Sequence, residues 1–151
     1  MRPEDLVAIE TIRRLKARYF RLLDTKRWDE WADLFTEDAV MDVTDDTGDR
    51  ASGTVRGRDA IVATVSAALA DARTVHHGHT PEIEIVDDAH ATGTWAMEDT
   101  VDVAPPGEPP RGIHGTGWYH EEYRCEDGTW RIAAMHLERL RVDPLGPAGA
   151  W

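Results

Sequence analysis

The feature that most constrains the fold is a long alternation of side chains from Ala91 to Val103. Successive side chains of a β-strand point to opposite faces, so alternate residues share one face. One face carries small and apolar residues together with one carboxylate: Ala91, Gly93, Trp95, Met97, Asp99, Val101 and Val103. The residues between them are mostly polar. This pattern predicts a long strand of an antiparallel sheet that buries one face and leaves the other accessible to solvent.

Three helices are predicted in the first half of the chain. The first runs from Glu4 to about Leu23, because apolar residues recur at three- and four-residue spacing: Leu6, Ile9, Ile12, Leu15, Tyr19 and Leu22. The basic residues of this segment, Lys16 among them, fall largely elsewhere on the helix. A second, shorter helix has an apolar side made of Trp28, Trp31, Ala32, Leu34 and Phe35. The third helix is predicted over Arg58 to Ala72.

Strands account for most of the remaining chain. A hairpin is predicted from residues 39–43 and 52–56, with its turn at residues 45–49. Two further long strands, 112–125 and 129–143, are joined by a turn at residues 126–128, and residues 144–151 are predicted to be a flexible tail. Helices followed by long antiparallel strands indicate one α+β domain over residues 1–143, in which three helices pack on a strongly curved half-barrel sheet.

Composition narrows the possible partners and the compartment. The net charge of −12 argues against binding to nucleic acid or to an anionic membrane surface, where basic patches supply the attraction. Cys125 is the only cysteine of the 151 residues, so an intrachain disulfide is impossible. The first residues contain no apolar segment that would direct export, and we therefore expect a cytoplasmic protein.

Potential chemistry is concentrated in residues 75–85, where His76, His77 and His79 begin an alternating strand. Histidine titrates near neutrality and serves in proton transfer and in metal ligation. Simple alternation places His77 and His79, not His76, on the face of the following isoleucines. A β-bulge near Gly78 or Pro81 would bring His76 to that face instead. Pro81 itself predicts a sheet edge or a bulge, because proline cannot donate to a ladder.

Two carboxylates add to this candidate site. Asp99 lies on the apolar face of its predicted strand, where an ionised group is costly unless it is paired. Its partner is either an arginine, in a structural ion pair, or a histidine on a neighbouring strand, and we favour His76. Asp24 lies at the end of the first helix, where the helix dipole disfavours an anion, so either solvent screens it or function retains it.

A metal centre is the alternative use of the histidines. The spacing His77-x-His79 followed by Glu84 resembles the first metal motif of cupins. The second cupin motif is absent, and two amphipathic helices at the front do not suit that fold. The sequence therefore favours a site without metal or cofactor.

Four segments carry a resemblance to a known family: residues 19–24, 76–83, 91–99 and 127–130. Together they resemble the SnoaL-like branch of the NTF2-like superfamily, in particular the bile acid 7α-dehydratases and, more distantly, the scytalone dehydratases. The resemblance covers the chain from Ile9 to Val142 and implies a cone-shaped half-barrel. Carried over by position, it implies the catalytic residues Tyr19, Asp24, His76 and Asp99. It also implies a substrate contact at Arg139, and His114, a further candidate for substrate binding, stands where the dehydratases have an amide. Trp95 and Met97, on the apolar strand face, are expected to supply the apolar surface of the substrate site.

The resemblance implies a dehydratase that eliminates water from a steroid-like or polycyclic hydroxy-ketone by acid–base catalysis. The same base would also serve a steroid or polyketide isomerase or cyclase, and a binding module that lacks catalysis is a third alternative. Arg139 is expected at the mouth of the site, contacting an anionic part of the substrate, as in a CoA thioester. A homo-trimer or homo-dimer is expected, with aromatic residues covering the outer face of the sheet: Trp118, Tyr123 and Trp130.

Overall fold

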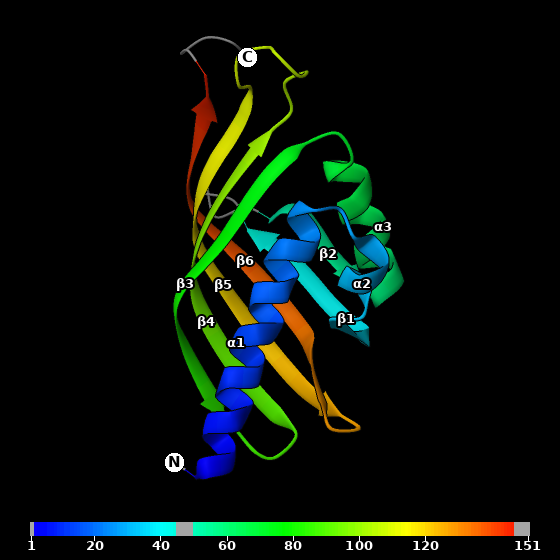
Figure 1. Cartoon of the computed structure of the whole chain (residues 1–151), viewed down its shortest axis with the longest axis vertical. Coiled ribbons are helices and arrows are strands. Elements are labelled where there is room, and N and C mark those ends of the chain that lie inside the picture. The colour runs from blue at the N-terminus through cyan, green and yellow to red at the C-terminus, as the bar shows by residue number, and fades with distance from the viewer. Residues whose placement is uncertain (1, 45–49, 147–151) are drawn as a thin grey trace.

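Three helices lie against one face of a single twisted sheet in the computed structural model, which describes residues 2–44 and 50–146 (Figure 1). The helices are α1 (Pro3–Asp24), α2 (Trp28–Ala32) and α3 (Arg58–Leu69). The strands are β1 (Phe35–Thr44), β2 (Arg50–Arg56), β3 (Arg73–Ile85), β4 (His90–Asp102), β5 (Gly112–Glu126) and β6 (Thr129–Leu145). The sheet does not close on itself, so the predicted α+β half-barrel is confirmed.

The sheet has the strand order β2-β1-β6-β5-β4-β3. All neighbouring strands described are antiparallel except β1 and β6, which pair in parallel. The last strand of the chain therefore lies inside the sheet, between the first strand and β5. Strands β5 and β6 continue beyond the helices at one end, which gives the molecule its open, tapered shape (Figure 1).

Helix α1 buries a stripe along its length that includes Ile12, Leu15, Tyr19, Leu22 and Leu23. Lys16 belongs to the same stripe and is fully buried, so its assignment away from the apolar side was wrong. The position follows from helical spacing, since residue 16 is four residues after Ile12 and three before Tyr19.

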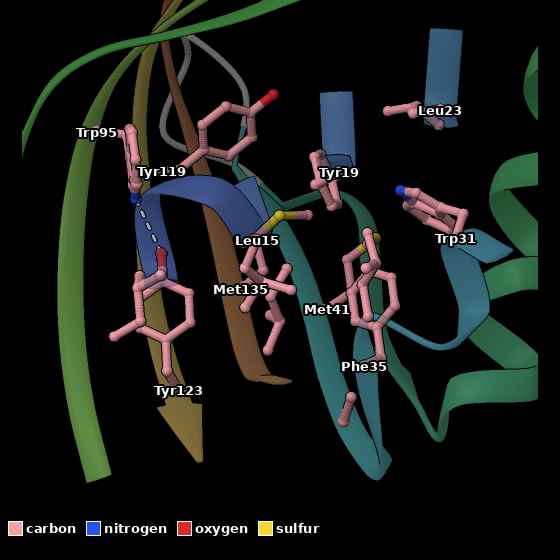
Figure 2. Packing of buried hydrophobic residues seen from close by; sticks show 14 of the residues in the cluster. Leu15, Tyr19, Leu23, Trp31, Phe35, Met41, Trp95, Tyr119, Tyr123 and Met135 are labelled. Carbon is pink, nitrogen blue, oxygen red and sulfur yellow. Dashed lines mark hydrogen bonds between the residues drawn. The ribbon is translucent and has the colours of Figure 1, made fainter. Parts of the chain in front are cut away.

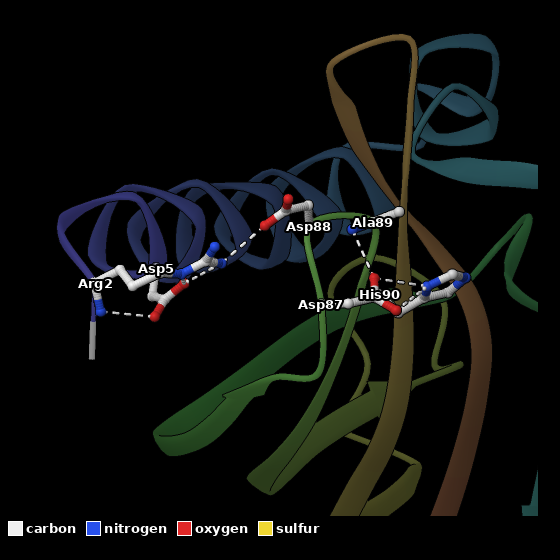
Figure 3. Close-up of polar contacts among 6 residues, drawn as sticks. All are labelled: Arg2, Asp5, Asp87, Asp88, Ala89 and His90. Atoms are coloured by element: carbon white, nitrogen blue, oxygen red, sulfur yellow. Dashed lines mark hydrogen bonds and ion pairs between the residues drawn. The ribbon is translucent and has the colours of Figure 1, made fainter.

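The start of α1 is tied to the turn between β3 and β4. Asp5 accepts a hydrogen bond from the backbone of Arg2, and the Arg2 guanidinium bonds Asp88 at 2.8 Å (Figure 3). In the same turn Asp87 accepts hydrogen bonds from the Ala89 backbone and the His90 ring (Figure 3). These contacts hold the N-terminal end of α1 over the edge of the sheet.

Some helices and strands end at other residues than predicted. Helix α2 ends at Ala32, and Phe35 already begins β1 instead of extending the helix. Strand β6 continues to Leu145, so Pro144 and Leu145, which we expected in the tail, pair with β5. The turn at residues 45–49 and the end of the tail at residues 147–151 lie outside the described residues.

The core fills the space between the helices and the concave face of the sheet (Figure 2). Tyr19, Trp31 and Phe35 pack on one side of it with ring centroids 4.8 to 6.0 Å apart, and Phe35 meets the other two rings edge to face. Tyr123 and Trp130 are buried, so of the aromatic residues expected on the outer face only Trp118 is exposed. Among the described residues, no helix is long and apolar enough to cross a bilayer.

Strand β3 is an edge strand and contains the predicted bulge. Its pairing with β4 shifts between His79 and Glu82, and Thr80 within the bulge has a φ of 37°. Before the bulge, even-numbered residues face the core, whereas after it Ile83 and Ile85 do. His76 is therefore buried, and His77 and His79 lie on the outer face of the sheet.

Candidate active site

His76 and Asp24 form a close pair where the end of α1 meets β3. The Nδ1 atom of His76 lies 2.6 Å from Oδ1 of Asp24, and the backbone N–H of His76 donates to Oδ2 at 3.0 Å. The His76 side chain is 8% exposed and that of Asp24 22%, so the pair lies at the margin of the core. The expected orienting partner of His76 was Asp99, but Asp24 makes this contact.

Two residues that sequence reasoning missed hold this carboxylate in place. The hydroxyl of Thr74 donates to Oδ1 of Asp24 at 2.9 Å and accepts a hydrogen bond from Nζ of Lys26, also at 2.9 Å. Burial by itself raises the pKa of Asp24, but the hydrogen bonds from His76 and Thr74 outweigh it and leave the pKa below its ordinary value. Thr74 could have been found from alternation, because it shares a face with His76.

Asp99 is buried directly across from His76, but it is bound to an arginine. Arg139 on β6 donates to both carboxylate oxygens of Asp99, at 2.9 and 2.6 Å. The Nε2 atom of His76 lies 3.9 Å from Oδ2 of Asp99, which is too far for a hydrogen bond. The predicted His76–Asp99 hydrogen bond is therefore wrong, and the alternative of a structural ion pair is what the structure contains.

A glycine makes room for this ion pair. A Cβ atom at Gly115 would lie 1.9 Å from Nη1 of Arg139 and 2.5 Å from Oδ1 of Asp99. The close approach of the two charged groups therefore requires glycine at this position. Because Asp99 occupies both Nη atoms of Arg139, that side chain is not the exposed anion contact we expected, and it is 13% exposed.

Tyr19 lies deeper, in the aromatic part of the core (Figure 2). Burial, together with the negative charges of Glu121, Asp99 and Asp24, raises the pKa of Tyr19 well above its ordinary value. Its hydroxyl therefore stays protonated and is a donor at neutral pH. The three carboxylates lie near enough to raise the pKa of Tyr19 because α1 packs across the concave face of the sheet. Glu121 and Asp99 lie on that face, and Asp24 ends the helix.

A buried charge network lies beside Tyr19 and was not predicted. Nζ of Lys16 lies 2.5 Å from Oε1 of Glu121, and both side chains are completely buried. Glu121 also accepts a hydrogen bond from the hydroxyl of Tyr123, which in turn accepts one from Nε1 of Trp95 at 2.8 Å (Figure 2). Trp95 is thus held by a core network, and both it and Met97 are buried as predicted.

His114 lies on the opposite face of the sheet from His76. It pairs with Thr100 on the outer side of β4 and β5, and its Nε2 atom lies 2.8 Å from Oε1 of Glu98. A residue in this position cannot touch a substrate bound between α1 and the concave face. The substrate-binding role expected for His114 is therefore wrong.

The arrangement can remove a proton from a substrate. An ionised carboxylate only accepts hydrogen bonds, so Asp24 requires a proton on Nδ1 of His76 and leaves the lone pair on Nε2. That nitrogen lies 3.9 Å from Oδ2 of Asp99, and the Tyr19 hydroxyl is a buried donor on the same helix as Asp24. A base, an orienting carboxylate and a buried donor are the components of acid–base catalysis.

A one-sided layer of helices on an open, tapered sheet, with a histidine–aspartate pair at its margin, defines an NTF2-like α+β protein. The chain belongs to the SnoaL-like domain family, whose model matches residues 4–136. The match covers the elements that hold the candidate site up to the middle of β6.

Solved structures share this fold. A variant of Rv3472, a protein of unknown function from Mycobacterium tuberculosis, is 30% identical, with a TM-score of 0.74 over 95% of this chain and 77% of that one. A protein from Novosphingobium aromaticivorans provisionally described as a scytalone dehydratase is 23% identical, with a TM-score of 0.76 over 97% of each chain. The hexachlorocyclohexane dehydrochlorinase LinA-type3 from Novosphingobium barchaimii is 20% identical, with a TM-score of 0.77 over 96% of this chain and 93% of that one.

Proposed function

We propose that the protein is a cofactor-independent lyase that eliminates water from a steroid-like or polycyclic hydroxy-ketone. The observation that carries the proposal is the 2.6 Å contact between Nδ1 of His76 and Asp24, which leaves Nε2 as an oriented base at the margin of the core. Similar folds described as a scytalone dehydratase and a dehydrochlorinase support an elimination reaction. The name dehydratase describes removal of water from a substrate, and the name dehydrochlorinase describes removal of hydrogen chloride.

In the proposed reaction, Nε2 of His76 takes a proton from the carbon next to the carbonyl group. Asp24 fixes the tautomer before the transfer and stabilises the imidazolium that forms. Asp99 lies 3.9 Å from Nε2 and attracts the same cation. Unit charges at this distance interact by about 1 kcal/mol in water and about 4 kcal/mol near a protein surface, and Arg139 offsets part of that attraction.

The developing negative charge needs a donor, and the departing hydroxide needs a proton. Tyr19 supplies a hydroxyl that stays protonated at neutral pH because burial raises its pKa. We assign it to the carbonyl or leaving oxygen, where a donor in a buried site is worth the most. The proton that Nε2 of His76 has taken then passes to the departing hydroxide, which leaves as water and restores the neutral imidazole with its Nδ1 proton still donated to Asp24.

The first experiment is a thermal-shift screen of purified protein against steroid hydroxy-ketones, aromatic polyketides and their CoA thioesters. Compounds that raise the melting temperature are then incubated with enzyme and analysed for loss of water by mass spectrometry. An isomerase would convert the same compounds without a change of mass, and a binding module would shift the melting temperature without turnover.

Variants then test the proposed catalytic roles of Asp24 and His76. Asp24→Asn is expected to lower kcat by about 100-fold or more, because an amide no longer enforces the reactive tautomer. His76→Ala is expected to abolish turnover. His90→Gln is the matched control, since His90 is an exposed histidine paired with Asp87 far from the site. Full activity of the His76→Ala enzyme would overturn the proposal.

A further inference from the structure

The outer face of the sheet carries a group of potential metal ligands that the proposed reaction does not use. His77 and His79 project from β3 on the same side, and Glu98 on β4 lies directly opposite His77. The ligand atoms of these three residues all lie within 4.8 Å of one another. Among the residues that the structure describes, no other group of three meets this condition.

The positions follow from strand geometry. Residues two apart on a strand share a face, so both imidazoles lie above the same region of the sheet. The regular pairing of this run ends at the bulge that follows His79, and β3 is the edge strand of the sheet. The residue opposite His79 is Ala96, whose small side chain leaves room for the imidazole to lean towards Glu98. Bulges are frequent beside functional sites, where they direct side chains.

The distances between the ligand atoms of these three residues suit a metal ion after a small rotation of the histidine side chains. A tetrahedral zinc ion with bonds of about 2.0–2.2 Å separates its ligand atoms by about 3.3–3.6 Å. In the structure Nε2 of His79 lies 3.7 Å from Oε2 of Glu98, and the His77 and His79 ring centroids are 5.7 Å apart. Both histidines are exposed, so rotation of their side chains closes the remaining gap without disturbing the core.

A further histidine orients the carboxylate. Nε2 of His114 on β5 lies 2.8 Å from Oε1 of Glu98, whereas Oε2 is the oxygen that faces His79. One carboxylate oxygen is thus held by a neighbour and the other is directed at the two imidazoles. Metal-binding carboxylates are commonly held in this way, and loss of the outer partner weakens metal binding about 10- to 100-fold.

We propose that His77, His79 and Glu98 bind one Zn²⁺ ion per chain, with His114 as a positioning residue for Glu98. Two imidazoles and one carboxylate are a ligand set that zinc accepts, with water completing the tetrahedron. The ligands differ from the Glu84 set suggested by the sequence motif, because Glu84 pairs with Thr92 farther along the strand. The site lies on the other face of the sheet from His76, so it is independent of the proposed lyase site.

The test is a titration of the full-length, chelator-treated protein with ZnCl₂, followed by isothermal calorimetry and by competition with a chromophoric chelator. We expect saturable binding of one equivalent per chain. His77→Gln and His79→Gln are each expected to weaken binding at least 10-fold, and His114→Gln by about 10- to 100-fold. Substitution with Co²⁺ should give the visible absorption of a four-coordinate ion.

His120→Gln is the matched control. His120 lies on the same outer face and its Nε2 is 2.8 Å from Glu138, so it reports non-specific binding to histidine–carboxylate pairs. It should leave zinc affinity unchanged. No saturable binding, or equal affinities for His77→Gln, His79→Gln and the unsubstituted protein, would overturn the proposal. Removing zinc should not change lyase turnover, so failure of one proposal does not affect the other.

Discussion

At Asp24 one carboxylate accepts three hydrogen bonds, from the ring and backbone of His76 and from Thr74. A group with this many donors has little freedom to rotate, which explains how it can fix the orientation of a histidine from the end of a helix. The sequence showed that a carboxylate at this position is unusual, but spacing could not reveal its partner. The two residues are 52 positions apart, so only the tertiary fold brings them together.

Asp99 shows the limit of sequence reasoning at a single residue. Alternation correctly predicted a buried carboxylate, and both a histidine and an arginine were considered as its partner. The partner that Asp99 has in the structure is Arg139, whose side chain reaches it from β6 across the position of Gly115. A pattern along one strand contains no information about which long side chain crosses from two strands away.

Gly115→Ala tests the space that this ion pair needs. The added methyl group would overlap Nη1 of Arg139, so the pair must separate or the strands must shift. We expect a loss of about 1–3 kcal/mol in the free energy of unfolding, measured by urea denaturation. Thr116→Ala, one residue along the same strand, is the control. A change below about 0.5 kcal/mol for Gly115→Ala would show that the backbone relaxes around the methyl group.

At the scale of elements, the helices and long strands followed from periodicity, because each buries one face. Lys16 is the instructive exception. Its charge suggested solvent, whereas its spacing in α1 places it on the buried stripe, where it meets Glu121 of β5. Glu121 alternates with Tyr119 and Tyr123, so the same test would have identified it. A lysine on the buried face of the helix and a glutamate on the buried face of the strand together predict an ion pair. Neither residue alone would predict it.

Lys16→Met is expected to destabilise the protein strongly, because it leaves the Glu121 carboxylate buried without its cation. Removing one partner of a buried ion pair costs about 3–5 kcal/mol. Adding Glu121→Gln should restore much of this loss, since the amide needs no counter-charge and can still accept the hydrogen bond from Tyr123. Chemical denaturation of the two single variants and the double variant measures the coupling. Additive effects would contradict the pairing.

Asp102 stabilises the connection between β4 and β5. It accepts hydrogen bonds from the backbone of Ala104, from the side chain of Arg73 and from the backbone of Arg111, which together lower its pKa to about 2. A lowered pKa means that the contribution to stability is complete above the ordinary value of 3.8 and is lost as the pH falls towards about 2.

The expected result is a pH-dependent effect of Asp102→Asn. The variant should be less stable than the parent protein at about pH 5, and the difference should shrink at about pH 2.5. Urea unfolding at both pH values gives the two differences. Asp59→Asn is the control, since Asp59 is fully exposed and reaches Arg58 only at 3.9 Å. A constant difference for Asp102→Asn would mean that these hydrogen bonds do not stabilise the ionised form.

At the scale of the whole molecule, helices cover only the concave face of the sheet (Figure 1). Trp118 remains exposed on the opposite face, with 37% of its surface accessible. We predict that this face meets a second copy and that light scattering at micromolar concentration will detect a dimer or trimer. Trp118→Glu should shift the protein towards monomer, whereas Val86→Glu, an exposed apolar position outside the strands, should not. A monomeric parent protein would contradict this prediction.

The parallel pairing of β6 with β1 also has a consequence for the order in which the protein can be made. Strand β6 comprises the 17 residues Thr129–Leu145, and it alone connects the β1–β2 pair to the β5–β4–β3 group. While a ribosome is still synthesising that segment, the growing chain has two separate pieces of sheet with unpaired edges. Strand β6 must therefore emerge before the two pieces can join into one sheet, and until then both edges are open to pairing with other chains.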